Sequence, residues 1–132
     1  QPGVVEEKGC LPRVIQRKFS GSVRGINFET GSATIKKASF RLLDEAVKVF
    51  TQYPFLRIDI TGHTDDEGAD DMNMKLSQDR ADAVRLYLIE KGISPERLTS
   101  QGFGETTPIG NNKTAGGRAQ NRRIEFKIRG AN

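Results

Sequence analysis

Residues 60–84, ITGHTDDEGADDMNMKLSQDRADAV, join the end of a strand pattern to the start of a helix pattern. Upstream, residues 55–61 alternate apolar and polar side chains, which predicts a half-buried strand. Over residues 71–91 the apolar residues recur every three or four positions, which predicts a helix with one buried stripe. The quoted stretch therefore predicts a strand, a polar loop at residues 62–70 and a helix that Gly92 stops.

Arg80 is the unexpected residue of that helix. At about 100° per residue it falls near the centre of the predicted stripe, between Leu76 and Val84. Asn73 and Ser77 lie on the same face, so a polar line runs along the side that should meet the core. A buried guanidinium needs a partner, because breaking a buried ion pair costs roughly 3–5 kcal/mol. We therefore expect either a structural salt bridge at the edge of the core or an anion-recognition site.

The same two spacings of apolar residues, every second residue for a strand and every third or fourth for a helix, predict the rest of the fold. The further elements are a first strand within residues 19–33, a helix over 34–53, a third strand at 97–104, a polar loop at 105–120 and a last strand at 121–130. Ser32 or Thr34 can cap the first helix. The order strand, helix, strand, helix, strand, strand (βαβαββ) predicts an α/β (α+β) two-layer sandwich. It should have a mixed sheet with both helices on one face.

Composition limits the classes of function. The chain has 132 residues, 35% hydrophobic and 29% charged, which suits one soluble globular domain. No apolar run approaches the roughly 18–20 residues of a membrane span. The net charge of +4 is mild and its basic residues are interleaved with acidic ones, so we expect no nucleic-acid partner.

Residues 1–18 have no sustained period, and their prolines and glycines predict a linker before a domain at residues 19–132. The chain lacks an initiating Met and a signal peptide, so we expect an excised fragment or a processed chain. Cys10 is the single cysteine and cannot form an internal disulfide. It is either an inert thiol or the partner of a cysteine further upstream.

The predicted topology brings two polar turns together. If the first two strands are parallel neighbours, the turns that follow them meet at the edge of the sheet where α/β folds bind ligands. Asp65 comes just after the second strand, and the helix that carries Arg80 starts at the same edge. A carboxylate that faces a guanidinium suits a zwitterion, because the first binds an ammonium group and the second a carboxylate. This describes the end group of an amino acid.

Three rival chemistries are weaker. Zinc needs further His or Cys ligands besides His63, and calcium needs an oxygen-ligand spacing that residues 65–71 lack. A hydrolase needs a nucleophile and a base at a plausible spacing, and none is visible. We therefore expect no metal, no cofactor and no catalytic residue, so the protein is not predicted to be an enzyme. His63 should support the turn through hydrogen bonds.

Several separate blocks of the sequence resemble the OmpA-like domain, and they match in order. They are IDITGHTDDEG at residues 58–68, N..LS..RADAVRLYL at 73–88, GFGE at 102–105 and GRAQNRRIEF at 117–126. The resemblance covers about residues 19–129. It implies a periplasmic domain that binds peptidoglycan non-covalently. The implied ligand is the diaminopimelate of the stem peptide, whose side chain ends in a free ammonium and a free carboxylate.

The resemblance also implies site residues. The family's aspartate falls on Asp65, its arginine on Arg80 and its asparagine on Asn73. Leu76 would line the pocket, and the first turn would contribute through Phe28, Thr30 and Gly31, with a backbone contact at Gly31. For the last motif we expect a structural or rim role. The rim candidates are Thr64, Arg118 and Arg122, while Asn121 belongs to the same motif.

The expected function is therefore an anchor that ties a Gram-negative outer-membrane protein or lipoprotein to the cell wall from the periplasm. The membrane would be reached only through parts of the parent protein outside this chain. An OmpA-fold protein–protein interaction domain without peptidoglycan affinity stays open as the alternative, and a homodimer stays open as well. The segment PGVVEEKGC resembles the end of a thrombospondin type 3-like repeat, which would supply the upstream partner of Cys10.

Overall fold

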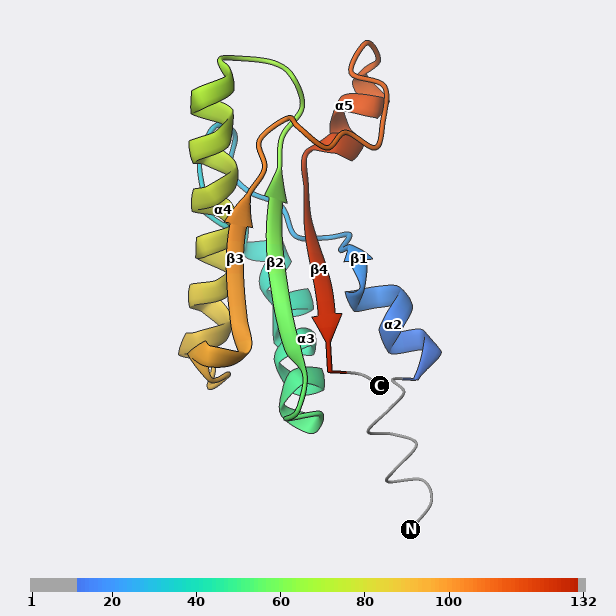
Figure 1. Cartoon of the computed structure of the whole chain (residues 1–132), viewed down its shortest axis with the longest axis vertical. Coiled ribbons are helices and arrows are strands. Elements are labelled where there is room, and N and C mark those ends of the chain that lie inside the picture. Colours follow the sequence, from blue (N-terminus) through green and yellow to red (C-terminus); the bar gives the residue numbers. More distant parts are fainter. Residues whose placement is uncertain (1–11, 131–132) are drawn as a thin grey trace.

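The alternating sequences around Ile60 and Ile124 form the two central strands of a mixed four-stranded sheet (Figure 1). The computed structural model describes residues 12–130. In chain order its elements are α2 (Arg13–Phe19), β1 (Gly21–Ser22), α3 (Phe40–Gln52), β2 (Arg57–His63), α4 (Asp70–Glu90), β3 (Leu98–Gly102), α5 (Ala115–Asn121) and β4 (Arg123–Arg129). Single 3-10 turns, Lys37–Ser39 and Pro95–Arg97, precede α3 and β3.

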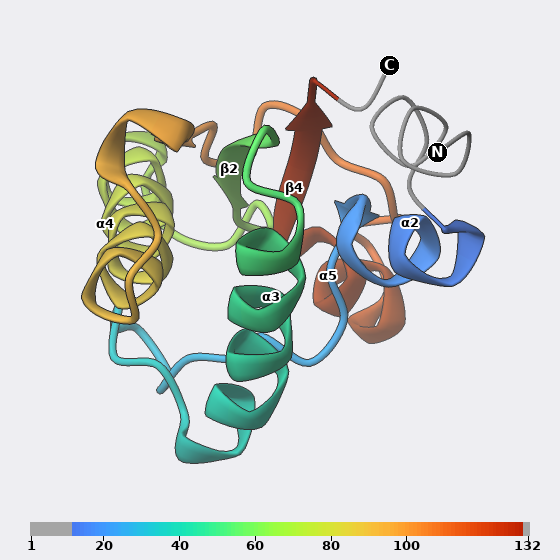
Figure 2. The ribbon, with the colours of Figure 1, turned by 90° about the horizontal axis from the view of Figure 1, so that it is seen from below.

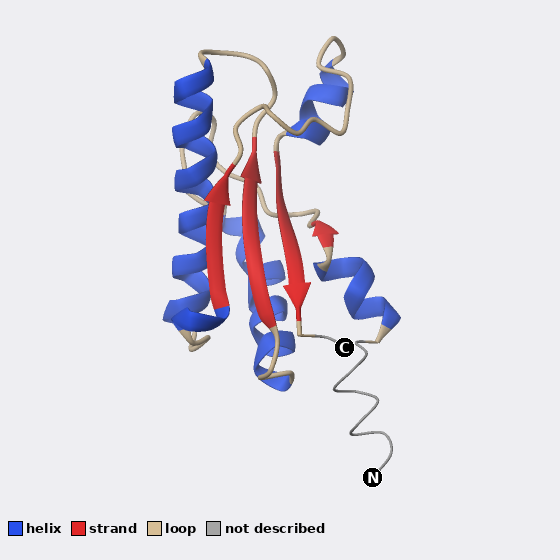
Figure 3. Cartoon of the chain, viewed as in Figure 1, coloured by secondary structure: helices blue, strands red, loops and turns tan. Residues whose placement is uncertain are grey.

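The sheet has the strand order β1-β4-β2-β3. Strands β2 and β3 are parallel and are joined through α4, whereas β4 runs antiparallel to both β2 and β1. Helices α3 and α4 cover one face, and the other face carries no layer in the described residues (Figures 2 and 3). The two-layer α/β sandwich with both long helices on one face is confirmed.

The core lies between that helical layer and the sheet. It is formed by alternate residues of β2 and β4 and by the inner sides of α3 and α4, and its fully buried members include Ile58, Ile60, Ile124, Phe126, Leu43, Phe50, Val84 and Leu88. Along β4 the residues between these are partly or fully exposed, so the strand has the predicted solvent-facing side. Within residues 12–130, no helix has the length and apolar character needed to cross a membrane.

The first strand differs from its prediction. Only Gly21–Ser22 pairs in the sheet, antiparallel to β4 at the edge, so the first two strands are not parallel neighbours. Val23 and Ile26 are buried in irregular backbone, and Phe28 forms one isolated bridge with Ile35. The alternating apolar residues here indicate buried side chains but not a paired strand, because an irregular segment can bury the same side chains.

Two helices were not predicted. Helix α2 lies mostly in the stretch interpreted as linker and buries Phe19, which is 2% exposed. Helix α5 lies in the stretch interpreted as a polar loop, where two glycines mask the helix pattern. The proposed repeat end and Cys10 lie outside the described residues.

Helix α3 begins at Phe40 and not near residue 34, so neither predicted cap acts on it. The Ser32 hydroxyl instead accepts a hydrogen bond from the Thr34 amide at 2.8 Å, closing a local turn. Helix α4 matches its prediction and ends before Gly92, whose φ of +109° breaks the helix.

The buried side of α4 is rotated from the predicted stripe. Its fully buried line is Asn73, Ser77, Ala81, Val84 and Leu88. Arg80 lies beside this line and is partly buried, so its predicted place at the centre of the stripe was wrong. The apolar residues alone had pointed to Leu76 and Tyr87, because polar residues that are buried against the sheet do not enter such a count.

Candidate ligand-binding site

A cavity of about 680 Å³ opens at the carboxyl end of β2. Its walls come from the loop before α3, the end of β2, the first turns of α4, and the junction of α5 with β4. Its lining comprises Ile26, Asn27, Phe28, Thr30, Gly31, Lys36, His63, Thr64, Asp65, Glu67, Asn73, Leu76, Arg80, Ala119, Arg122 and Arg123. Of the predicted site residues, Arg118 alone is outside this lining.

Asp65 is the buried carboxylate of the cavity, with a side chain 8% exposed. One of its oxygens accepts a hydrogen bond from the Glu67 amide at 3.0 Å, which closes an Asx-type turn. The other oxygen pairs with Arg122 Nη1 at 2.5 Å. The neighbouring Thr64 hydroxyl donates to the carbonyl of Asp65 at 2.8 Å. The direct partner of Asp65 is thus Arg122, whereas Arg80, expected to face Asp65, lines the same cavity without a direct bond to it.

Arg80 binds the loop before α3 through its carbonyl oxygens. Its Nε donates to Ser32 O at 2.8 Å, its Nη2 donates to Glu29 O at 3.3 Å, and the guanidinium lies 4.9 Å from the centre of the Phe28 ring. Within residues 12–130 it forms no ion pair, so the expected structural salt bridge is not seen there. The loop of residues 28–32 is therefore held at the cavity by Arg80, and not by parallel pairing of the first two strands.

The charges of the cavity act on one another. Burial lowers the pKa of Arg80, the cation of Arg122 lowers it further, and the carboxylate of Asp65 raises it. The guanidinium groups of Arg80 and Arg122 and the buried carboxylate of Asp65 therefore act on one another within one hollow, whose lining also includes Lys36, Glu67 and Arg123. Such an arrangement can hold an anion between the two arginines and a cation at Asp65.

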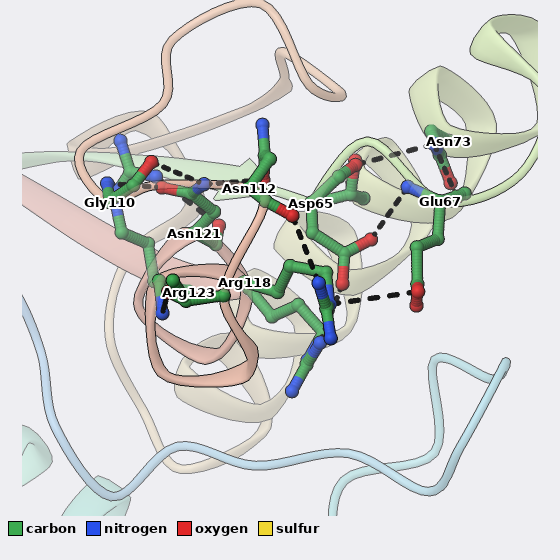
Figure 4. Close-up of polar contacts among 12 residues, drawn as sticks. Asp65, Glu67, Asn73, Gly110, Asn112, Arg118, Asn121 and Arg123 are labelled. Atoms are coloured by element: carbon green, nitrogen blue, oxygen red, sulfur yellow. Dashed lines mark hydrogen bonds and ion pairs between the residues drawn. The ribbon is translucent and has the colours of Figure 1, made fainter.

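Asn73 fixes the loop that presents Asp65. From the first turns of α4, its amide nitrogen donates to Glu67 O at 2.9 Å and to Asp65 O at 3.4 Å (Figure 4). It also lies 3.4 Å from the carboxylate of Glu105, beyond β3. A short, buried amide is needed here because three acceptors converge on one donor group.

His63 joins the end of β2 to the loop after β3. Its two ring nitrogens lie 2.9 Å from the Thr61 hydroxyl and 2.8 Å from the Thr107 hydroxyl, and its ring stacks on Phe103 with centroids 5.6 Å apart. Burial lowers the pKa of His63 to about 4, and the Arg123 cation adds to this. The neutral imidazole supports the turn, as predicted.

The last motif divides into three roles. Asn121 is fully buried, accepts from the amides of Ile109 and Gly110 at 2.7 Å, and donates to Gly110 O at 3.0 Å, which fixes the loop before α5 (Figure 4). Arg118 stands at the rim, where it donates to a backbone carbonyl and lies 3.6 Å from Glu67. Arg122 enters the cavity.

The sequence did not predict the pairing of Arg122 with Asp65. It also did not predict these charged and uncharged wall residues: Ile26, Asn27, Lys36, Glu67, Ala119 and Arg123. The signal for Glu67 was available, because it follows Asp65 within the loop. The pairing of Arg122 with Asp65 had no such signal, because the position of Arg122 depends on α5, which the sequence did not predict.

The comparisons with known proteins agree with this geometry. The sequence pattern of the OmpA family matches residues 27–122. The chain is similar to the probable lipoprotein YiaD of Escherichia coli, at 42% identity over 103 residues, which cover 78% of this chain and 47% of YiaD. It is also similar to the peptidoglycan-binding protein ArfA of Mycobacterium bovis, at 33% identity over 78% of this chain and 32% of ArfA. The chain thus matches about half or less of these relatives' length.

Among solved structures, the peptidoglycan-associated lipoprotein of Burkholderia pseudomallei superposes with a TM-score of 0.73 at 26% identity, over 86% of this chain and 92% of that one. The family match covers the loop before α3, Asp65, Arg80 and Arg122, so each wall of the cavity contains matched residues. This chain is a member of the OmpA family.

Proposed function

We propose that this domain binds peptidoglycan non-covalently through the diaminopimelate of the stem peptide. In this proposal it anchors a Gram-negative outer-membrane protein or lipoprotein to the cell wall from the periplasm, and no catalytic step is involved. The observation that carries the proposal is the grouping of one buried carboxylate, Asp65, with the guanidinium groups of Arg80 and Arg122 in one cavity.

The chemistry of the ligand fits this grouping. The side chain of diaminopimelate ends in an ammonium and a carboxylate on the same carbon. The ammonium can donate to Asp65 while the carboxylate accepts from the guanidinium groups, and each charge-assisted hydrogen bond contributes about 1.5–3 kcal/mol. Leu76 and Phe28 give the cavity its apolar wall, which suits the methylene chain between the ends of the ligand.

The relatives support the same ligand class. One is named for binding peptidoglycan and another for associating with it, and two are named as lipoproteins. A small single site binds weakly by itself. Many copies tethered to one membrane and facing one polymer bind together much more firmly, so modest affinity per domain is sufficient for an anchor.

The test is a titration of the domain, followed by NMR or calorimetry, with a stem peptide that contains meso-diaminopimelate and with the matching lysine peptide. Wild-type protein should bind the diaminopimelate peptide alone, and binding should weaken as salt rises. Asp65→Ala should abolish it. Asp66→Ala is the matched control, because Asp66 is the adjacent exposed carboxylate outside the cavity lining. Binding of neither peptide would leave a protein-interaction domain instead.

A further inference from the structure

Asp65 already has a partner before any ligand arrives. Its two carboxylate oxygens are taken by the Glu67 amide and by Arg122. An incoming ammonium must therefore share this carboxylate with Arg122 or displace it. Asp65 is nearly buried while the Arg122 side chain is 47% exposed, so Arg122 is the partner that has room to move.

The backbone of Arg122 is fixed by α5, while its half-exposed guanidinium is held by a hydrogen bond. Arg122 caps the carboxyl end of α5 and its amide donates to Arg118 O at 3.1 Å, directly before β4 begins. Among the described residues the guanidinium makes one hydrogen bond, from Nη1 to Asp65. Within residues 12–130 its Nε and Nη2 have no protein partner, so a second anion can be bound without breaking any other contact.

Arg80 sets the electrostatic cost of that movement. Arginine stays protonated in proteins, and Arg80 lies in the same cavity and interacts with both Arg122 and Asp65. If a plain ammonium group takes Asp65, Arg122 loses its anion and stays beside Arg80, cation against cation. If the ligand also brings a carboxylate next to its ammonium, that carboxylate can lie between the two guanidinium groups and replace Asp65 as their counter-charge.

We propose that Arg122 is the residue that makes this site select an ammonium group with a carboxylate on the same carbon and reject a plain ammonium group. This inference rests on the proposed function and deepens it. Arg122 acts as the repulsive element of the site: the ion pair with Asp65 must be exchanged, and the exchange is favourable only for a zwitterion. Selection between diaminopimelate and lysine then comes from rejection as well as from added contacts.

The experiment measures the affinities of three variants and the wild type for the diaminopimelate and lysine stem peptides, at one salt concentration. Arg122→Gln should gain affinity for the lysine peptide, and the ratio of the two affinities should fall at least tenfold. Arg122→Lys keeps the cation and should keep the rejection. Arg129→Gln is the matched control, since Arg129 also pairs with an aspartate, Asp59 at 2.9 Å, and is 48% exposed but is outside the cavity lining, and its ratio should stay that of the wild type.

Two results would overturn the inference while leaving the proposed function intact. In both, the Arg122→Gln domain keeps the wild-type ratio: in one its two affinities are unchanged, and in the other both are reduced by the same factor. A wild-type domain that binds neither peptide would instead overturn both. A second measurement needs no variant: the Nε–H resonance of Arg122 in wild-type protein should shift on adding the diaminopimelate peptide, and an unmoved resonance at saturation would refute the exchange.

Discussion

The two ends of the sheet bury very different side chains. At the carboxyl end of β2 the buried residues include His63, Thr64, Asp65, Asn73 and Asn121. At the amino end, where β2 and β3 begin, the buried residues are mainly apolar. No buried side-chain nitrogen or oxygen in the described part lacks a hydrogen-bond partner. The buried polar residues at this end are therefore stabilised by hydrogen bonds that offset the cost of their burial.

One arginine at each end makes the contrast sharper. Arg97, before β3, donates to Leu56 O and Phe50 O at 2.8 Å and to Tyr53 O at 3.0 Å, which ties the end of α3 to the start of β2. Arg80 binds backbone carbonyls in the same way, and burial lowers the pKa of both arginines. Only Arg80 shares a cavity with a carboxylate. A buried arginine is therefore no evidence of a site by itself, whereas opposite charges around a hollow are.

The largest expected effect is the pH dependence of stability at the polar end. The pKa of His63 is lowered from 6.5 to about 4. Between these values the unfolded chain binds the proton more tightly, so His63 contributes stability above pH 6.5 that is lost as pH falls towards 4. The full loss is about 3 kcal/mol, at 1.36 kcal/mol per pKa unit.

Urea unfolding of wild type and His63→Gln between pH 7 and pH 4 measures this contribution. The difference in unfolding free energy between the two proteins should shrink by most of that amount as the pH falls. Parallel stability curves would show that His63 is not buried as a neutral ring.

The next effect separates the two arginines by function. Arg80→Ala should weaken binding of the diaminopimelate peptide about 100-fold, which is about 2.7 kcal/mol. The protein should stay folded, because the carbonyls of Glu29 and Ser32 lie near the surface and water can replace the guanidinium. Peptide titration and urea unfolding on the same sample test both statements. An unfolded variant would make Arg80 a structural residue like Arg97.

At the amino end the effects should be reversed. Arg97→Ala removes three hydrogen bonds from a cationic donor to carbonyls at the end of α3 and in the turn before β2, and we expect a loss of about 2 kcal/mol in unfolding free energy. The affinity of the folded protein for the peptide should stay within about twofold of wild type, which is about 0.4 kcal/mol. Weakened binding would mean that the two ends are coupled.

The sequence predicted the elements that bury one regular face and failed on those held by polar contacts. Strands β2 and β4 and helices α3 and α4 follow from apolar periodicity. Helix α5 does not, because it contains adjacent glycines and is held by the hydrogen bonds of Asn121 to the loop before it.

The same limit applied to the candidate site. Asp65 and Arg80 could be singled out because one follows a strand and the other interrupts a helical face. The contact between Asp65 and Arg122 could not be foreseen, since it joins positions 57 residues apart through α5. Nor could the carbonyl partners of Arg80, because their loop follows no period.

The smallest effect concerns one glycine at each end. Gly31, in the cavity wall, has φ +67°, and Gly92, after α4, has φ +109°; an added Cβ would meet no atom within 4 Å at either. Alanine at each position should therefore cost strain alone, about 1 kcal/mol of unfolding free energy. Only Gly31→Ala should also weaken peptide binding, a few-fold, because relieving the strain moves the loop that Arg80 holds. Titration of both variants decides: equal binding would mean that the backbone at Gly31 does not shape the site.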